Sequence, residues 1–491
     1  MSAPEKSGRL LYRVINNSGV YLVGDLFYRF VNFFSGVLIV RSLGSEAYGQ
    51  YSFIYVFLGF FETFMDFGLN NILVREVAQR PEETPKLLGN AVLLRLILAG
   101  ISIPLSWTLV SCLGYPAPVR FGVYLASLQL FLVFRSLFEI IFRLKLMMVW
   151  PAFWNGVRAL LNFALIALAF YMHAGVPLFI LAAIVSGFIS MTGLIVFSLR
   201  FTPYSFQWDG VILRRLIREC WPLAASNILT LFCLRIDVIL LSKLRGFAEV
   251  GLYNAALRIT ESFGILAISL MSSLYPLLSE AYLQDRDRFN KMIGTAYRVL
   301  LFASLPLAVG GFFTGRELIM MLFGAAYASS GTALVILLGY MTAYFIGNLL
   351  VNVLYACGRQ ILDVQITFFQ ICAAVAMNFL LIPTFGFIGA AMSTALGGFF
   401  AVLLMMGFID RYLGLKFYFW GREAVLPGII NLFFFAVLAV FTRLRHGPVV
   451  ETVFFGVFVY AGLLFLFRVL SLKELRQYFQ HTLRKKNGRV A

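Results

Sequence analysis

Seven arginines stand inside long apolar stretches of the sequence, where an ionised side chain is costly and is therefore a candidate for function. They are Arg29, Arg95, Arg135, Arg158, Arg235, Arg258 and Arg298. A guanidinium stays charged when it loses water, and its planar fork matches phosphate and carboxylate oxygens, whereas a buried lysine is easily neutralised. These arginines predict an anionic ligand, unless each one pairs with a carboxylate or reaches the membrane interface.

Polar side chains three or four residues apart form stripes along several apolar segments, so each stripe shares one face of a helix. The stripes comprise Tyr21, Asp25, Arg29 and Asn32; Glu62, Asp66 and Asn70; Arg135 and Glu139; Asn155, Arg158 and Asn162; Asn227 and Thr230; and Asn254, Arg258 and Glu261. A sealed helix bundle needs few such stripes, whereas a water-filled cavity between two lobes needs them on both sides. The stripes therefore predict helices that face a wet cavity.

Five carboxylates in the apolar segments are candidates for ion coupling, because a carboxylate beside a cavity can carry H+ or coordinate Na+ as access alternates. They are Asp25, Glu62, Asp66, Asp237 and Glu261. Charge compensation of neighbouring arginines is the competing interpretation, and Asp25 with Arg29 at i,i+4 has the form of such a pair. Both interpretations stay open for these residues.

The sequence offers no pattern for a catalytic centre, a metal site or a bound cofactor. Its five cysteines and three histidines are widely spaced, which gives neither metal-ligand spacing nor a Ser/His/Asp arrangement. A Gly-x-x-x-x-Gly-Lys-Ser/Thr motif is also missing from the sequence, so direct use of ATP would need a separate subunit.

Composition identifies the elements that must position these residues. Of the 491 residues, 61% are hydrophobic and 13% charged, against about 45–50% and 25% in soluble domains, which excludes a soluble globule. Apolar runs long enough to span a bilayer occur at residues 14–40, 47–71, 89–111, 117–142, 150–172, 176–200, 220–242, 248–276, 292–314, 330–356, 362–383, 386–411, 424–442 and 448–470. We predict an all-α polytopic membrane protein with about fourteen transmembrane helices.

The distribution of basic residues predicts the orientation. Lys and Arg gather in every second connection and in both tails, so the positive-inside rule places both termini in the cytoplasm. The N-terminal segment shows no small-residue cleavage site, and we expect it to stay as the first span. The net charge of +17 is explained by this bias, and we expect no nucleic-acid partner.

An internal repeat predicts two lobes. The segment from Leu38 to Tyr51 aligns without gaps on Leu240 to Tyr253, and Gly246 lies 202 positions after Gly44. Six spans separate the copies, so both point the same way, as in parallel repeats related by an axis along the membrane normal. We predict an N-lobe at residues 1–205 with helices 1–6, a C-lobe at 206–415 with helices 7–12, a central cavity between them, and two further helices with a basic cytoplasmic tail at 416–491.

The first hairpin resembles a known family. Val40-Arg-Ser-Leu-Gly-Ser-Glu-Ala-Tyr-Gly-Gln-Tyr51, followed by Asp66-Phe-Gly-Leu69 and Val74-Arg-Glu76, is similar to the N-terminal pattern of Wzx-like oligosaccharide flippases of polysaccharide biosynthesis. These proteins belong to the multidrug/oligosaccharidyl-lipid/polysaccharide exporter superfamily. The motif covers about forty residues, and the fourteen-span plan extends the resemblance to the whole chain.

The resemblance implies a transporter rather than an enzyme. It implies that an undecaprenyl-diphosphate-linked oligosaccharide, such as an O-antigen unit, crosses the cell inner membrane from the cytoplasmic to the periplasmic leaflet by alternating access driven by an ion gradient. Family members place arginines in a central cavity for the diphosphate and anionic sugars, a role that the resemblance transfers to Arg29, Arg135, Arg158, Arg235, Arg258 and Arg298.

Partners and alternatives complete these expectations. We expect contacts with membrane lipids, a polysaccharide polymerase or synthase as partner, and a monomer. A small-molecule or drug:cation antiporter of the same superfamily is the first alternative, and its cavity should be dominated by carboxylates. A membrane glycosyltransferase or polymerase is the second, against which stands the shortness of the outer connections.

Overall fold

The chain is an all-helical membrane protein. The computed structural model describes residues 3–201, 208–414, 417–445, 447–467 and 469, and these residues form helices joined by short turns. Thirteen helices in these ranges are long and apolar enough to cross a membrane. The predicted all-α polytopic class is confirmed.

The helices follow the predicted spans closely. The first half of the chain contains α1 (Ala3–Asp66), α2 (Leu69–Gln79), η1 (Pro81–Glu83), α3 (Thr84–Cys112), α4 (Ala117–Ala126), η2 (Ser127–Phe134), α5 (Arg135–Leu144), α6 (Val149–Tyr171), α7 (Val176–Leu199) and α8 (Gly210–Leu244). The second half contains α9 (Phe247–Gln284), α10 (Arg286–Phe323), η3 (Ala325–Tyr327), α11 (Ser330–Ala356), α12 (Gln360–Phe385), α13 (Phe387–Leu413), α14 (Phe417–Leu444) and α15 (Val449–Leu466).

Helix α1 accounts for the difference between thirteen helices and fourteen predicted spans. It is 64 residues long, with non-helical dihedral angles at Gly44 (φ 68°, ψ 173°). A straight helix of that length would measure about 96 Å, roughly three times the hydrocarbon thickness of a bilayer. The kink at Gly44 divides α1 into two arms, which match the predicted spans 14–40 and 47–71.

The two copies of the internal repeat share one local geometry and touch each other. Gly246 has a positive φ of 88°, as Gly44 does at the equivalent position, and glycine adopts this region without steric cost. A Cβ added at Gly49 would overlap the carbonyl oxygen of Phe247, and one added at Gly251 would overlap that of Ser45. Because Ser45 and Phe247 are themselves equivalent, the contact is reciprocal, as expected for a pseudo-twofold axis between the copies.

The chain divides into two compact units. One comprises Met1–Asn254 with Asn378–Ala390, and the other comprises Ala255–Met377 with Ala391–Ala491. The lobe boundaries after residues 205 and 415 and the separate C-terminal segment stay predictions.

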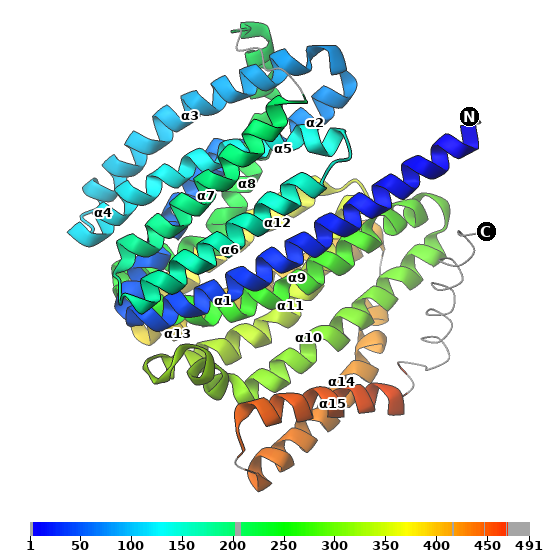
Figure 1. The fold of residues 1–491 in the computed structure, drawn as a ribbon. Helices are drawn as coiled ribbons and strands as arrows, with labels where there is room; N and C mark the ends of the chain where they lie inside the picture. The colour runs from blue at the N-terminus through cyan, green and yellow to red at the C-terminus, as the bar shows by residue number, and fades with distance from the viewer. Residues whose placement is uncertain (1–2, 202–207, 415–416, 446, 468, 470–491) are drawn as a thin grey trace. The chain divides into compact units, whose positions relative to one another are not determined.

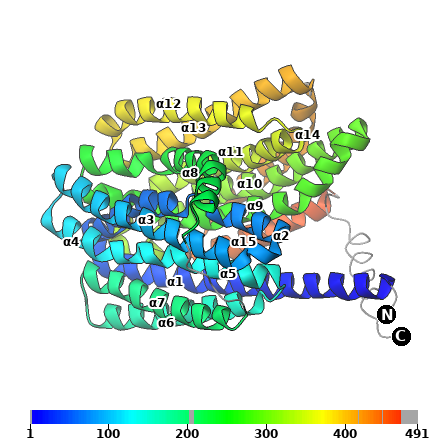
Figure 2. The same cartoon turned by 90° about the horizontal axis from the view of Figure 1, so that it is seen from above.

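Neighbouring helices of each unit run side by side. In the first unit α6 lies beside α1, and α7 lies beside α6 (Figures 1 and 2). The second arm of α1 contributes Phe53 and Ile54, both fully buried, to the core of this unit. In the second unit α10 packs against α11 and α14 (Figure 1). Each unit thus contains packed helices that can hold polar side chains in place.

Candidate functional site

A polar cavity of about 520 Å³ lies within the first unit. Its walls come from α1, α2, η2, α5, α6 and α8. The lining residues are Glu62, Thr63, Asp66, Asn70, Leu132, Val133, Arg135, Ser136, Glu139, Arg158, Asn227, Thr230, Leu231 and Leu234. Most carry a polar or charged side chain, which is unusual for the interior of a transmembrane bundle.

The cavity is the meeting point of four of the predicted polar stripes. Each occupies one helical face, and together they contribute Glu62, Asp66, Asn70, Arg135, Glu139, Arg158, Asn227 and Thr230. Of the predicted site residues, the structure therefore brings together two arginines, Arg135 and Arg158, and two carboxylates, Glu62 and Asp66.

Arg95 does not line the cavity, but it contacts residues that do. Its side chain is fully buried, and one guanidinium nitrogen donates to Asp66 Oδ1 at 2.7 Å and to Asn70 Oδ1 at 3.4 Å. The other donates to Ser136 Oγ at 2.7 Å and to the carbonyl oxygen of Val133. A buried charge must be compensated in this way, because desolvation penalises an unpaired ion by several kcal/mol. Arg95 thereby fixes α3 to the ends of α1, α2 and α5.

The carboxylate of Asp66 is therefore paired with an arginine. The same Oδ1 that meets Arg95 also accepts a hydrogen bond from Asn70 Nδ2 at 2.8 Å. Charge compensation of an arginine, one of the two interpretations left open for this carboxylate, is thus what the structure displays. Its partner is Arg95, which lies on another helix.

Arg135 and Glu139 form a second ion pair in the wall. Arg135 Nη2 lies 3.0 Å from Glu139 Oε1, and the two side chains are only 11% and 15% exposed. The same nitrogen donates to the carbonyl oxygen of Pro151 at 3.4 Å. The pair spans one turn of α5, the spacing at which opposite charges attract along a helix. Arg135 therefore lines the cavity, but Glu139 already compensates part of its positive charge.

Arg158 and Glu62 are the charged lining residues without a direct partner. In the part of the chain that the structure describes, neither makes an ion pair or a hydrogen bond. They are close enough to attract each other electrostatically, and Asp66 also acts on Glu62. A guanidinium held in a polar cavity without bidentate protein partners is suited to bind phosphate or carboxylate oxygens.

The other predicted residues of the first unit lie outside this cavity. Arg29 Nε donates to Asp25 Oδ2 at 2.7 Å, and the arginine side chain is 57% exposed. This is the i,i+4 pair that the sequence predicts. Asp237 is buried and accepts hydrogen bonds from the Tyr253 hydroxyl and from the backbone N–H of Val238. Arg235 is half-buried on α8 and does not line the cavity.

Three predicted residues belong to the second unit. Arg298 Nε donates to Glu423 Oε2 at 2.6 Å, which joins α10 to α14. Arg258 is half-buried and Glu261 exposed on α9. None of the three is among the residues that line the polar cavity of the first unit.

Arg95 is the residue whose importance the sequence did not reveal. The sequence counts it among the seven candidate arginines and leaves two interpretations open: binding of an anionic ligand, or a structural role by pairing with a carboxylate or reaching the membrane interface. A signal was nevertheless present, because the residues three and four positions away on its own helix are Ala91, Val92, Leu98 and Ala99. An intramembrane arginine without a carboxylate on its own helix must find one on a neighbouring helix.

The cavity presents side chains that can bind a polar ligand. Among the described residues, no group of three or more His, Cys, Asp or Glu side chains could hold a metal ion. Amide, hydroxyl and guanidinium groups are present to donate hydrogen bonds, and carboxylates are present to accept them. The arrangement suits a polar or anionic group of a ligand.

Family models agree with the fold and the sequence pattern. A model described as polysaccharide biosynthesis protein matches residues 14–282, more than half of the chain. A second model, described as MatE, matches residues 222–380.

Relatives and solved structures point in the same direction. The chain is 25% identical over 191 residues to the capsular polysaccharide biosynthesis protein CapF of Staphylococcus aureus, covering 39% of this chain and 48% of that one. It is 22% identical over 400 residues to a putative O-antigen transporter of Shigella flexneri, covering 76% and 92%. The chain spans about half the length of the first curated relatives that it matches.

Its fold matches a structure of the lipid II flippase MurJ in an inward closed conformation. The TM-score is 0.76 at 15% sequence identity, and the match covers 91% of this chain and 98% of the other. The predicted family resemblance is confirmed. This multi-pass membrane protein belongs to the polysaccharide biosynthesis protein family.

Proposed function

We propose that the chain is a flippase that moves an undecaprenyl-diphosphate-linked oligosaccharide from the cytoplasmic to the periplasmic leaflet of the inner membrane. The observation that carries the proposal is Arg158, a guanidinium without a direct ion pair in the described chain, in a polar cavity of a membrane-spanning unit. A diphosphate presents oxygen acceptors that match its donors. The names of the relatives, among them a putative O-antigen transporter and the lipid II flippase MurJ, support this cargo.

The position of the cavity supports loading from the cytoplasmic leaflet. The predicted orientation places both termini in the cytoplasm, so the second arm of α1 runs inward and ends at Asp66. The cavity lies beside this end, and α6, which carries Arg158, starts from the same side. In this proposal the chain acts as a monomer by alternating access and passes its cargo to a polysaccharide polymerase or synthase.

Glu62 is the carboxylate best suited to ion coupling. Asp66 and Glu139 each have a guanidinium nitrogen within 3.0 Å, so protonation would break an ion pair. Glu62 has no such pair in the described chain, and its charge acts on Arg158. A proton or sodium ion at Glu62 would weaken its hold on Arg158 and favour binding of an anionic cargo, which links the ion to the substrate.

The test is translocation in cells that lack the gene and carry a variant copy. We expect Arg158→Gln to lower translocation about tenfold or more, because one charge-assisted interaction with the diphosphate is lost. Arg158→Lys, which keeps the charge but not the fork, should retain part of the activity. The readout is the amount of lipid-linked oligosaccharide left in the cytoplasmic leaflet at equal protein levels.

Arg120→Gln is the matched control, because Arg120 is an exposed arginine of α4 outside the cavity. It should transport as the unaltered protein does. Normal translocation by Arg158→Gln would remove this site assignment. If the deletion strain accumulates no lipid-linked oligosaccharide in the cytoplasmic leaflet, the flippase proposal itself is wrong.

A drug:cation antiporter is the second candidate, favoured by the three carboxylates Glu62, Asp66 and Glu139 in the same cavity. It would export cationic drugs, so the deletion strain should become more susceptible to them. Glu62→Gln separates the two functions further. In an antiporter it should abolish export of the cation, whereas in the proposed flippase it should change the dependence of translocation on the proton or sodium gradient.

A further inference from the structure

The second unit contains a cavity of a different kind. It has a volume of about 660 Å³ and lies between α9 and α10. Its wall is mainly apolar, with Leu270, Leu277, Met292, Val299 and Leu300 among the lining side chains. We call it the α9–α10 groove. Leu277 and Val299 remain 46% and 45% exposed, so the groove offers an open apolar surface to a ligand.

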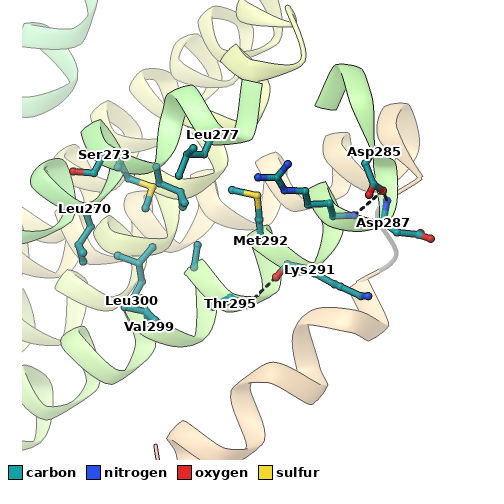
Figure 3. A pocket seen from close by; sticks show the side chains of 14 residues that line it. Leu270, Ser273, Leu277, Asp285, Asp287, Lys291, Met292, Thr295, Val299 and Leu300 are labelled. Carbon is teal, nitrogen blue, oxygen red and sulfur yellow. Dashed lines mark hydrogen bonds between the residues drawn. The ribbon is translucent and has the colours of Figure 1, made fainter. Parts of the chain in front are cut away.

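Charged residues lie at one end of the groove only. Asp285, Asp287, Arg288 and Lys291 belong to the lining, and all four are exposed. Figure 3 shows Asp285, Asp287 and Lys291 at the end opposite to Leu270, Val299 and Leu300. The groove therefore has a charged mouth and an apolar interior, an arrangement that is complementary to an amphipathic ligand.

Three of the four charged side chains at the mouth are not engaged in ion pairs with one another in the described ranges. Asp285 caps α10, accepting hydrogen bonds from the backbone N–H groups of Asp287 and Arg288 at 3.0 Å. In the described ranges of the chain, the side chains of Asp287, Arg288 and Lys291 form no ion pair. Two cations and one acid are thus available to a ligand at the mouth.

The sequence of α10 relates the two ends of the groove to the layers of a bilayer. Helix α10 has 38 residues and is about 57 Å long, well over the roughly 30 Å of the hydrocarbon core. The apolar span in its sequence starts at Met292, directly after Lys291. The mouth accordingly lies at the level of lipid headgroups, and the apolar wall extends from there into the hydrocarbon.

We propose that the α9–α10 groove binds a membrane phospholipid with a zwitterionic amine headgroup. The phosphate lies between Arg288 and Lys291, the amine faces Asp287, and an acyl chain follows Leu277 and Val299 into the groove. The mixed charge of the mouth is the reason for this choice. A polyprenyl diphosphate would bring several negative charges close to the two aspartates at the mouth. It has no positive group of its own that could pair with these carboxylates.

Binding to the purified, delipidated full-length chain tests the proposal, and native mass spectrometry counts the bound lipids. The probes are phosphatidylethanolamine, phosphatidylglycerol with the same acyl chains, and undecaprenyl phosphate. We expect one molecule of phosphatidylethanolamine to bind with a Kd about tenfold below that of phosphatidylglycerol, because only the amine can pair with Asp287. Translocation of cargo is not part of the readout, so failure here leaves the proposed function untouched.

Three variants assign the contacts. Asp287→Asn should remove the preference for the amine, and Arg288→Gln with Lys291→Gln should weaken both phospholipids about tenfold or more. Val299→Trp should fill the groove and lower binding of either lipid. Arg286→Gln is the matched control, since Arg286 carries the same charge two positions from Arg288 but lies over the rings of Tyr282 and Phe289, outside the lining.

Two results would overturn the proposal. One is equal affinity for both phospholipids that Asp287→Asn does not change. The other is displacement of phosphatidylethanolamine by undecaprenyl phosphate in the unaltered chain, lost in Val299→Trp, which would make the groove a site for the cargo lipid. Asp287 is exposed, so Asp287→Asn should fold normally and keeps the test decisive if Val299→Trp does not.

Discussion

The polar cavity of the first unit and the α9–α10 groove of the second unit use charge in opposite ways. In the cavity, charged side chains form the wall and are held by one another, as Arg95 is by Asp66 and Arg135 is by Glu139. In the groove, the wall is apolar and the charges stand at an exposed mouth. The difference in burial separates charges that compensate one another inside the protein from charges that stay exposed to solvent.

Desolvation is the physical reason. A buried ion loses its hydration and must be compensated by the protein, so a charged wall is also a structural network. An exposed charge keeps its water and gains little from a protein partner, so it stays available. Arg158 combines the two situations, because it lines a cavity and yet has no direct ion pair in the described chain.

The largest expected effect comes from removing the buried cation behind the cavity. Arg95→Ala should lower the free energy of unfolding by about 3–5 kcal/mol, because Asp66 and the carbonyl of Val133 lose the partner that compensates them. Thermal unfolding of the purified protein in detergent measures this loss. Arg288→Ala, at the exposed mouth of the groove, is the matched control and should change the stability by less than about 0.5 kcal/mol.

Equal stability of the two variants would break the comparison. It would mean that the Arg95 network contributes nothing beyond what any arginine side chain contributes. Arg95→Met adds a refinement, because a buried apolar side chain of similar length can restore packing but leaves Asp66 without a counter-ion.

Around the groove, apolar packing rather than ion pairing should contribute to the stability of the protein. Leu300 is fully buried on α10, whereas Leu277 is 46% exposed on α9. Leu300→Ala should lower the free energy of unfolding by about 2–3 kcal/mol through lost packing and the cavity that it leaves. Leu277→Ala should cost much less, because its side chain packs against little protein. A cost as large for Leu277 as for Leu300 would show that the groove is closed in the folded protein.

The sequence predicts the helical fold because membrane spans depend on local composition. Thirteen of the fourteen predicted spans correspond to one helix or to one arm of α1, and the span 117–142 is covered by α4, η2 and α5 in succession. About twenty apolar residues in lipid must satisfy their own backbone groups, which favours helices. The continuity of α1 through Gly44 is not predictable in this way. Glycine and the polar residues after it have the pattern of a turn, and only the positive φ of Gly44 reveals a kink.

The candidate site is predictable in part. The i,i+4 spacing identifies Glu62, Asp66 and Arg135 because neighbours on one helix face follow from helix geometry. Which stripes share a cavity depends on helix packing, which the spacing does not encode, and Arg29 satisfies the same pattern outside this cavity. Arg95 escapes prediction because its partners Asp66, Asn70 and Ser136 lie on three other helices.

A smaller effect is expected from the ion pair inside the cavity wall. In a double-mutant cycle, Arg135→Gln and Glu139→Gln should show a coupling of about 0.5–2 kcal/mol in the free energy of unfolding, because both side chains are largely buried and in contact. Chemical unfolding in detergent measures the four proteins of the cycle. Strict additivity of the two single changes would mean that the contact with Glu139 does not hold Arg135, and that Arg135 is as available to a ligand as Arg158.

The smallest effect belongs to the ion pair of the second unit. Arg298 is 44% exposed and Glu423 14% exposed, so solvent screens their attraction. The cycle of Arg298→Gln and Glu423→Gln should give a coupling of no more than about 1 kcal/mol, the range of exposed pairs, and high salt should reduce it. The same variants measure transport, because the family resemblance transfers substrate binding to Arg298. Loss of translocation in Arg298→Gln, with stability and Glu423→Gln activity unchanged, would place a second anion-binding arginine on α10. It would end the contrast between the charged cavity of the first unit and the apolar groove of the second.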